Sequence, residues 1–129
     1  MFVDASALVA MLAGDEEGPS CLSCIDTDGD PIWSAMSCWE TIRAVHKSRD
    51  VSFAAARDDV EAAASVLRLR LVEVGEDERR VALDAHETYG KGRHTAKLNM
   101  GDCFAYACAK TNGAKLLYKG NDFIHTDLA

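Results

Sequence analysis

Four acidic residues along the chain occupy places from which a sequence can assemble a metal site. Asp4 follows a short apolar run at the start of the sequence and Asp122 closely follows another, while Glu40 and Asp102 lie in segments with helical patterns. In a parallel sheet, residues beyond the carboxyl ends of the strands gather at one edge, and helices pack beside that edge. The sequence therefore predicts that the four acids converge.

Such a cluster has a definite chemistry. Like charges in a small volume repel one another, so the cluster is expected to hold divalent cations. Oxygen ligands without a matching set of Cys and His favour Mg²⁺ or Mn²⁺ over Zn²⁺. Mg²⁺ held by carboxylates beside a phosphate activates water and stabilises the leaving oxygen in phosphodiester cleavage. We expect this reaction, with Mg²⁺ as the cofactor and Mn²⁺ as a substitute.

The elements that must position the acids follow from the apolar pattern and the turn-forming residues. The predicted strands are residues 1–3, 32–35, 69–74 and 116–118. Four predicted helices are residues 5–13, 15–24 with an interruption at Gly18-Pro19, 76–89 and 102–111. Two more helices are predicted between residues 35 and 69, one with Ser37 and one with Ser52 as its N-cap. Residues 26–31 are predicted to form a turn. The alternation predicts an α/β fold with a central parallel sheet of about four to five strands and helices on both faces.

Length and composition predict one globular domain over residues 1–129, of which 48% are hydrophobic. The longest apolar run, residues 7–13, is too short to span a membrane, and no basic segment precedes it. An odd number of cysteines, five, argues against a disulfide framework. We expect a cytoplasmic protein without membrane association.

The net charge of −7 is unevenly distributed. Residues 1–40 contain eight acids and no Lys or Arg, whereas residues 88–129 contain six Lys or Arg and three acids. Residues 41–49 and 88–101 contain no acid at all. Basic side chains in these two stretches are either parts of a solvated surface or contacts for a nucleic-acid backbone. The candidate RNA contacts are Arg43, Lys91, Arg93 and Lys97.

Five segments, in order along the chain, carry a family resemblance. They are FVDASALVA at residues 2–10, SCWET at 37–41, YGKGRH at 89–94, LNMGDCFAYA at 98–107 and LLYKGNDFIHTD at 116–127. These segments resemble PIN-domain ribonucleases, most closely the VapC toxins of bacterial toxin–antitoxin (VapBC) systems. The resemblance spans nearly the whole chain, and it implies a single PIN domain over residues 1–129 folded as a three-layer sandwich.

The resemblance also implies an activity and roles for individual residues. It implies a metal-dependent endoribonuclease that cleaves RNA, tRNA being one structured substrate, and that forms a homodimer held inactive by a VapB-type antitoxin. The catalytic and metal-binding positions of the family fall on Asp4, Glu40, Asp102 and Asp122. Ser6 would orient a metal-bound water or ligand, and Asp127 would support the metal ligands from outside.

Several alternatives remain open. Residues 26–29 match part of the haloacid-dehalogenase-type phosphatase signature, with Asp26 and Asp28 as the acids, although Asp30 replaces its Thr. A non-catalytic PIN fold that only binds a partner is a second alternative, and EDTA-sensitive RNA cleavage distinguishes the enzyme from it. Trp33 and Trp39 are expected in the core, with stacking on bases as their alternative role.

Overall fold

The computed structural model describes residues 1–129 as four strands and six helices. The strands are β1 (Phe2–Val3), β2 (Ile32–Ser34), β3 (Arg70–Val72) and β4 (Leu116–Leu117). The helices are α1 (Ala5–Leu12), α2 (Gly18–Asp28), α3 (Ala35–Arg49), α4 (Phe53–Val66), α5 (Glu76–Tyr89) and α6 (Met100–Thr111). The predicted alternation of strands and helices is confirmed. None of the helices is both long and apolar enough to cross a lipid bilayer.

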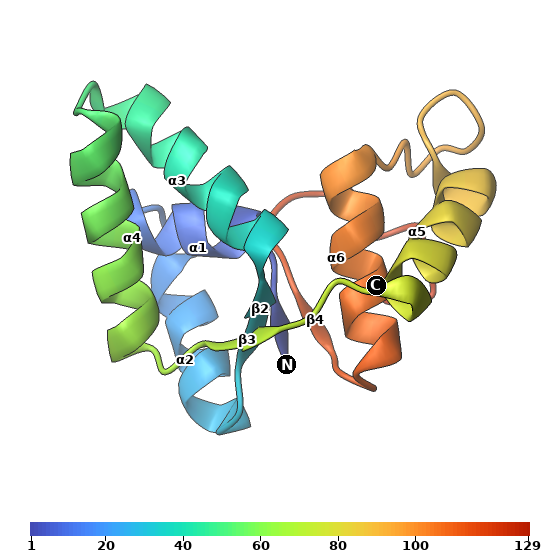
Figure 1. The fold of residues 1–129 in the computed structure, drawn as a ribbon, viewed down its shortest axis with the longest axis horizontal. Coiled ribbons are helices and arrows are strands. Elements are labelled where there is room, and N and C mark those ends of the chain that lie inside the picture. The colour runs from blue at the N-terminus through green and yellow to red at the C-terminus, as the bar shows by residue number, and fades with distance from the viewer.

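The strands form one parallel sheet in the order β3-β2-β1-β4. Phe2 of β1 pairs with Ile32 of β2 and with Leu116 of β4, so the first strand of the chain lies inside the sheet. Helices lie between successive strands along the chain, as parallel pairing requires. The carboxyl ends of β1, β2 and β4 therefore point the same way, toward the upper side of the sheet in Figure 1.

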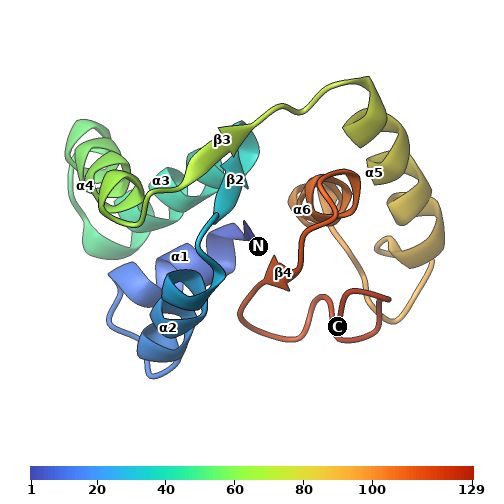
Figure 2. The same ribbon diagram turned by 90° about the horizontal axis from the view of Figure 1, so that it is seen from below.

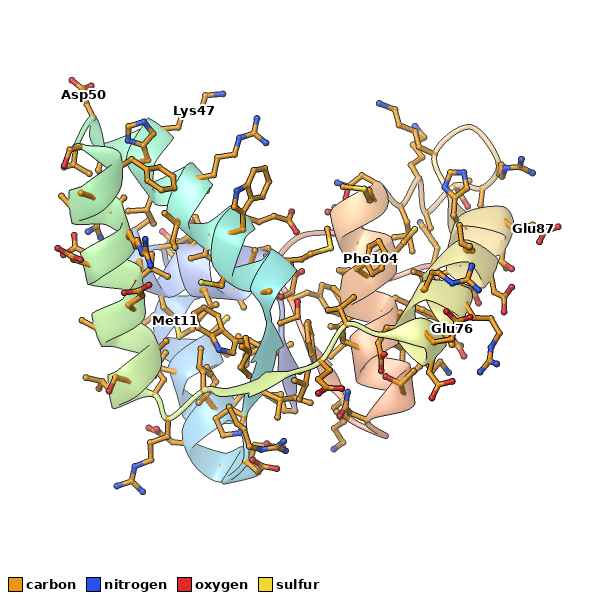
Figure 3. All side chains as sticks on the ribbon, in the orientation of Figure 1. Met11, Lys47, Asp50, Glu76, Glu87 and Phe104 are labelled. Carbon is orange, nitrogen blue, oxygen red and sulfur yellow. The ribbon has the colours of Figure 1, made fainter.

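Helices cover both faces of the sheet, which confirms the three-layer α/β sandwich. Helices α1 to α4 lie on one face and α5 and α6 on the other (Figures 1 and 2). Neighbouring residues of a strand point to opposite faces. Accordingly, Phe2 is buried in the core shared with α5 and α6, and Val3 in the core shared with α1 to α4. Charged side chains such as Lys47 and Glu87 project from the outer surfaces (Figure 3).

The predicted bounds of α2 are wrong. The helix covers Gly18–Asp28 instead of residues 15–24, because Pro19 lies in its first turn, where a missing N–H leaves no hydrogen bond unmade. Gly29, with a φ of 81°, ends it in the left-handed conformation that glycine adopts most readily. The pair Gly18-Pro19 therefore begins the helix and does not interrupt it.

The first residues of two other helices also differ from the prediction. The cap of α3 is Ser34 and not Ser37, because the Ser34 hydroxyl accepts the N–H of Ser37 at 3.2 Å. Helix α6 begins at Met100, two residues early, behind an N-cap at Asn99. Ser52 caps α4 as predicted, accepting the N–H of Ala55 at 3.1 Å.

The bounds of α2 also remove the phosphatase alternative. Asp26 and Asp28 lie on the exposed end of a helix, whereas the phosphatase signature requires an Asp directly after a strand. The predicted turn at residues 26–31 is therefore wrong for its first three residues. Asp28 instead accepts a hydrogen bond from the N-terminal amino group at 2.7 Å.

Candidate active site

Asp4 directly follows β1 and is the N-cap of α1. Its carboxylate accepts the N–H of Ser6 at 2.9 Å and a hydrogen bond from the Ser6 hydroxyl. That hydroxyl accepts the backbone N–H of Lys119, in the segment after β4, at 3.0 Å. Asp4 is only 8% exposed, and this burial raises its pKa. The hydrogen bonds from Ser6 offset part of the rise, and the charge of Asp122 adds to it.

Glu40 lies in the second turn of α3 and approaches the first turn of α6. Gly101 makes this approach possible, since a methyl group on its Cα would lie 2.5 Å from both carboxylate oxygens of Glu40. Burial raises the pKa of Glu40 to about 7, and the carboxylates of Asp4 and Asp102 add to the rise. The positive charge of Arg43 acts in the opposite direction. Glu40 is therefore close to acids from both faces of the sheet.

Asp102 lies in the first turn of α6, where reciprocal hydrogen bonds hold it. Its backbone N–H donates to the Asn99 side chain at 2.9 Å, and its carboxylate accepts the N–H of Asn99 at 2.9 Å. Burial raises the pKa of Asp102 to about 6. The bond from Asn99 opposes this rise, and the charges of Asp122 and Asp4 increase it.

Asp122 follows β4 and is the most exposed of the four acids. Its charge contributes to the raised pKa values of both Asp4 and Asp102, which shows that it lies near them. The structure therefore brings all four acids, from four separate segments, to the carboxyl edge of the sheet.

The chemistry of this donor set fits a hard divalent cation, because its ligands are carboxylate oxygens. As the side chains stand, no group of three or more His, Cys, Asp or Glu side chains encloses a position for a metal ion. Mg²⁺ suits such an open arrangement, since it usually keeps several waters and binds one or two carboxylates directly. A structural Zn²⁺ site would instead require a closed tetrahedral set containing Cys or His.

The two residues expected to support the site have different surroundings. Ser6 lies within the site and orients Asp4. Asp127 contacts the C-terminal half of α6, where its carboxylate accepts the Tyr106 hydroxyl at 2.8 Å and pairs with Lys110. These two partners lie about one and two helical turns beyond Asp102. The contacts of Asp127 thus hold residues 123–129 against α6 and do not reach the carboxylates.

The four basic candidates are all exposed. Lys91, Arg93 and Lys97 belong to the segment linking α5 to α6, which a bridge between Gly90 and Leu98 closes into a loop. This loop rises beside the first turn of α6, at the same edge of the sheet as α3 but over the opposite face (Figure 1). Arg43 lies on α3, close enough to Glu40 to lower its pKa.

Two features of the site, a required glycine and an ion pair, could not be predicted from the sequence. The need for glycine at position 101 is set by Glu40, which comes from another helix. Lys119 pairs with Asp15 across the segments that follow β4 and α1, 104 residues apart in sequence. This ion pair borders a cavity of about 370 Å³ between α1 and α3, beside Ser6 and Glu40.

The exposure of Trp39 could have been predicted from its position on α3. The expectation that it packs in the core is wrong, since Trp39 is 55% exposed, whereas Trp33 is buried at 7%. The buried face of α3 carries Ser37, Thr41 and Val45 at helical spacing, and Trp39 falls outside that stripe.

Known proteins match the chain over nearly its whole length. A family model described as PIN domain matches residues 1–128. Ribonuclease VapC30 of Mycobacterium tuberculosis is 38% identical over 135 residues, which cover 100% of this chain and 96% of the relative. A VapC ribonuclease of Rhizobium meliloti is 39% identical over 141 residues, which cover 98% of each chain.

Two solved structures share the fold at low sequence identity. One is a toxin–antitoxin complex from Klebsiella pneumoniae, with a TM-score of 0.71 at 15% identity, covering 98% of this chain and 92% of the matched chain. The other is VapC20 of Mycobacterium tuberculosis, described as a sarcin–ricin loop cleaving toxin. Its TM-score is 0.72 at 16% identity, with 95% and 92% of the two chains covered.

Proposed function

Because the chain belongs to the PIN-domain family, within its group of VapC ribonucleases, we propose that it is a metal-dependent endoribonuclease and the toxin of a toxin–antitoxin pair. One observation carries the proposal: Asp4, Glu40, Asp102 and Asp122 meet at the carboxyl edge of the sheet. Burial and mutual repulsion raise the pKa values of the first three, and a bound divalent cation would stabilise the ionised carboxylates and so oppose this rise.

The four acids would hold Mg²⁺, with Mn²⁺ as a substitute. A bound Mg²⁺ supplies a water of lowered pKa and neutralises charge on the leaving oxygen. The residues of the chain prepare the ligands for this task. Ser6 orients Asp4, the N–H of Asn99 orients Asp102, and Gly101 leaves room for the carboxylate of Glu40. Such supporting contacts keep a site close to its productive geometry.

We infer that the substrate is a structured RNA, with tRNA as one candidate. Relatives of the chain are named ribonucleases, and VapC20 is described as cleaving the sarcin–ricin loop. The loop with Lys91, Arg93 and Lys97 stands beside α6, and Arg43 stands on α3. A nucleic-acid backbone bound to the loop and to Arg43 would bring its phosphates to the carboxylates, which lie at the same edge of the sheet.

The direct test is cleavage of RNA by the purified protein. We expect cleavage with Mg²⁺ or Mn²⁺ and none with EDTA, and Asp4→Asn, Glu40→Gln and Asp102→Asn should each reduce the rate by orders of magnitude. Asp26→Asn, at an exposed acid on α2, is the matched control and should retain full activity. If Asp102→Asn were fully active, the assignment of the site would be wrong. If the wild type cleaved no RNA with either metal, the non-catalytic, partner-binding alternative would replace the enzyme.

The second part of the proposal is inhibition by a VapB-type antitoxin. Relatives carry the name VapC, and one structural neighbour is a toxin–antitoxin complex. An antitoxin that inserts an Arg or Lys side chain among the four acids would satisfy their charge in place of a metal.

An apolar groove offers the antitoxin a place to bind. It lies between α1, α2 and α4 and encloses about 590 Å³. Its lining includes Leu8, Met11, Leu12, Leu22, Val66 and Leu67. Val66 is 82% exposed, which is unusual for a large aliphatic residue beside other apolar side chains. An amphipathic helix of the antitoxin would bury this groove.

The inhibition model is tested on the co-purified complex. We expect the complex to cleave no RNA and to bind Mn²⁺ more weakly than the free chain, which we propose to be a homodimer in solution. A complex that bound Mn²⁺ normally and remained fully active would contradict inhibition through the carboxylates. The molar mass of the free chain in solution tests the homodimer.

A further inference from the structure

Helix α3 exposes a large aromatic side chain next to a site residue. Trp39 directly precedes Glu40 and is 55% exposed, whereas the only other tryptophan, Trp33, is buried at 7%. Exposing most of an indole to water forgoes hydrophobic stabilisation, because tryptophan has one of the largest apolar surfaces of any side chain. The exposed part of the ring is therefore accessible to a ligand.

Arg43 lies close to both this tryptophan and the Glu40 carboxylate. Its guanidinium carbon lies 5.4 Å from the centre of the Trp39 ring, in a cation–π arrangement one helical turn away. The same guanidinium lies close enough to Glu40 to lower its pKa. Trp39 and Arg43 thus form one exposed aromatic and cationic surface, here called the α3 platform, that borders the site acids.

We propose that the α3 platform binds an unpaired nucleotide of the RNA substrate, with its base stacked on Trp39 and a neighbouring phosphate on Arg43. Bases stack on aromatic side chains and guanidinium planes only when they are free of the double helix. In a duplex both faces of a base are already covered by its neighbours. The platform therefore selects single-stranded or looped RNA and places it next to Glu40.

The charge of the surroundings favours RNA over a protein partner at this place. A polyanion approaching four acids needs a fixed cation at the boundary, and Arg43 provides one beside Glu40. The exposed apolar surface suited to a protein helix lies elsewhere, in the groove between α1, α2 and α4. This inference rests on the proposed function, since it assigns an RNA segment to the platform.

The first experiment compares RNA binding by matched variants, all carrying Asp102→Asn to prevent cleavage and all assayed in Mg²⁺. The probes are labelled oligouridine and an RNA duplex of equal length. Trp39→Ala should weaken binding of oligouridine by about 5- to 100-fold, the effect of losing one stacked base, and should change duplex binding less than twofold. Trp39→Phe should restore most of the affinity. Phe53→Ala, which removes an exposed aromatic from α4, is the control and should bind oligouridine normally.

A second readout detects stacking directly. Because Trp33 is buried, quenching of tryptophan fluorescence on adding oligouridine reports on Trp39. We expect strong quenching by oligouridine and little by the duplex, with the quenching lost in Trp39→Ala. A circular dichroism melt confirms that each variant is folded.

The other outcomes separate this inference from the proposed function. If Trp39→Ala binds both probes as its parent does, the platform does not bind RNA and the inference is overturned. It is also overturned if Trp39→Ala changes only the oligomeric state or the affinity for a protein partner. If the wild type cleaves no RNA but the contrast between the probes persists, the platform stands and the proposed catalysis fails.

Discussion

At the level of single residues, Gly101 allows the carboxylate of Glu40 to approach the first turn of α6. The carboxylate of Glu40 occupies the space that a side chain at position 101 would fill. Helix α6 itself does not require this glycine, since alanine is the better helix former. The residue therefore serves the geometry of the site at some expense to helix stability.

We predict that Gly101→Ala separates activity from stability. The added methyl group displaces the end of a flexible side chain, so the fold should survive and the melting temperature should stay the same or rise. The displaced Glu40 carboxylate should lower the cleavage rate by about 10- to 100-fold, as small misplacements of catalytic groups do. Met100→Ala, at the exposed neighbouring position, is the control and should cleave normally. Full activity of Gly101→Ala would show that Glu40 need not lie close to α6.

The raised pKa values predict how the metal-free protein responds to pH. In the folded protein the pKa is about 7 for Glu40 and about 6 for Asp102, against ordinary values of 4.5 and 3.8. The folded state thus binds these protons more tightly than the unfolded state does. The corresponding stability is fully present below pH 3.8 to 4.5 and is lost as the pH rises to about 7.

Asp102→Asn should remove part of this pH dependence. In EDTA at pH 7.5 the variant should be more stable than the wild type by about 1 kcal/mol, because one repelling charge is gone and solvent screens part of the effect. The difference between the two proteins should shrink as the pH falls toward 4.

Melting curves in EDTA and in Mn²⁺ check this prediction. Mn²⁺ should stabilise the wild type by mass action and Asp102→Asn much less. A variant that melts below the wild type in EDTA and gains as much from Mn²⁺ would show that the acids do not share one site.

At the level of elements, local signals could be read from the sequence and contacts between elements could not. Strand β1, helix α1 and the position of Asp4 follow from an apolar run, an N-capping residue and a terminating Gly14. Gly18-Pro19 has two local interpretations, a break or a start. Pro19 is compatible with the start, and packing explains the need for glycine before it, since a side chain at Gly18 would come within 3.0 Å of the Ala10 carbonyl oxygen.

The same division holds within the candidate site. Gathering of the acids at one edge of the sheet could be predicted, because Asp4 and Asp122 follow parallel strands and the helices that carry Glu40 and Asp102 pack beside the same edge. The closeness of Glu40 to Gly101 could not, because it depends on how α3 faces α6 across that edge. The contacts of Asp127 with Tyr106 and Lys110 likewise depend on the path of the residues after β4.

The loop between α5 and α6 carries a prediction of its own. Replacing Lys91, Arg93 and Lys97 together by Ala should weaken RNA binding and reduce the slope of log affinity against log salt by about 2 to 3, because up to three phosphates lose a partner. The cleavage rate at saturating RNA should change much less, since the site acids are untouched. Binding as a function of salt concentration measures the effect.

A control of equal charge accompanies this loop variant. Arg57, Arg79 and Arg80 lie on exposed surfaces of α4 and α5, each paired with an acid of its own helix. Their joint replacement by Ala should leave the salt slope unchanged. An unchanged slope in the loop variant as well would mean that the loop is only a solvated surface.

At the level of the whole molecule, the groove proposed for the antitoxin helix lies apart from the site acids. The acids and basic candidates gather at the carboxyl edge of the sheet, and the apolar groove lies among α1, α2 and α4. Met11, which lines the groove, lies within this layer of helices in Figure 3. Binding of the antitoxin through the groove and cleavage of RNA should therefore respond to different substitutions.

We predict that Leu22→Asp and Val66→Asp, singly or together, prevent formation of the antitoxin complex and leave RNA cleavage intact. A carboxylate in the groove opposes burial of an apolar helix face. Both residues are exposed in the free chain, so their replacement should not unfold it. Leu83→Asp, at an exposed leucine of α5, is the control and should leave the complex unaffected. Co-purification and a cleavage assay measure the two effects.

The order of the strands bears on when a chain under synthesis becomes able to cleave RNA. Strand β1 is synthesised before its partner β4, and all six helices are synthesised between them. The Ser6 hydroxyl, which supports Asp4, thus lacks the N–H of Lys119 until that residue is added, 113 residues later than Ser6. Pairing between residues so distant in sequence comes late in folding. A nascent chain therefore carries the first acid of the site without an assembled active site until β4 and the residues after it have been made.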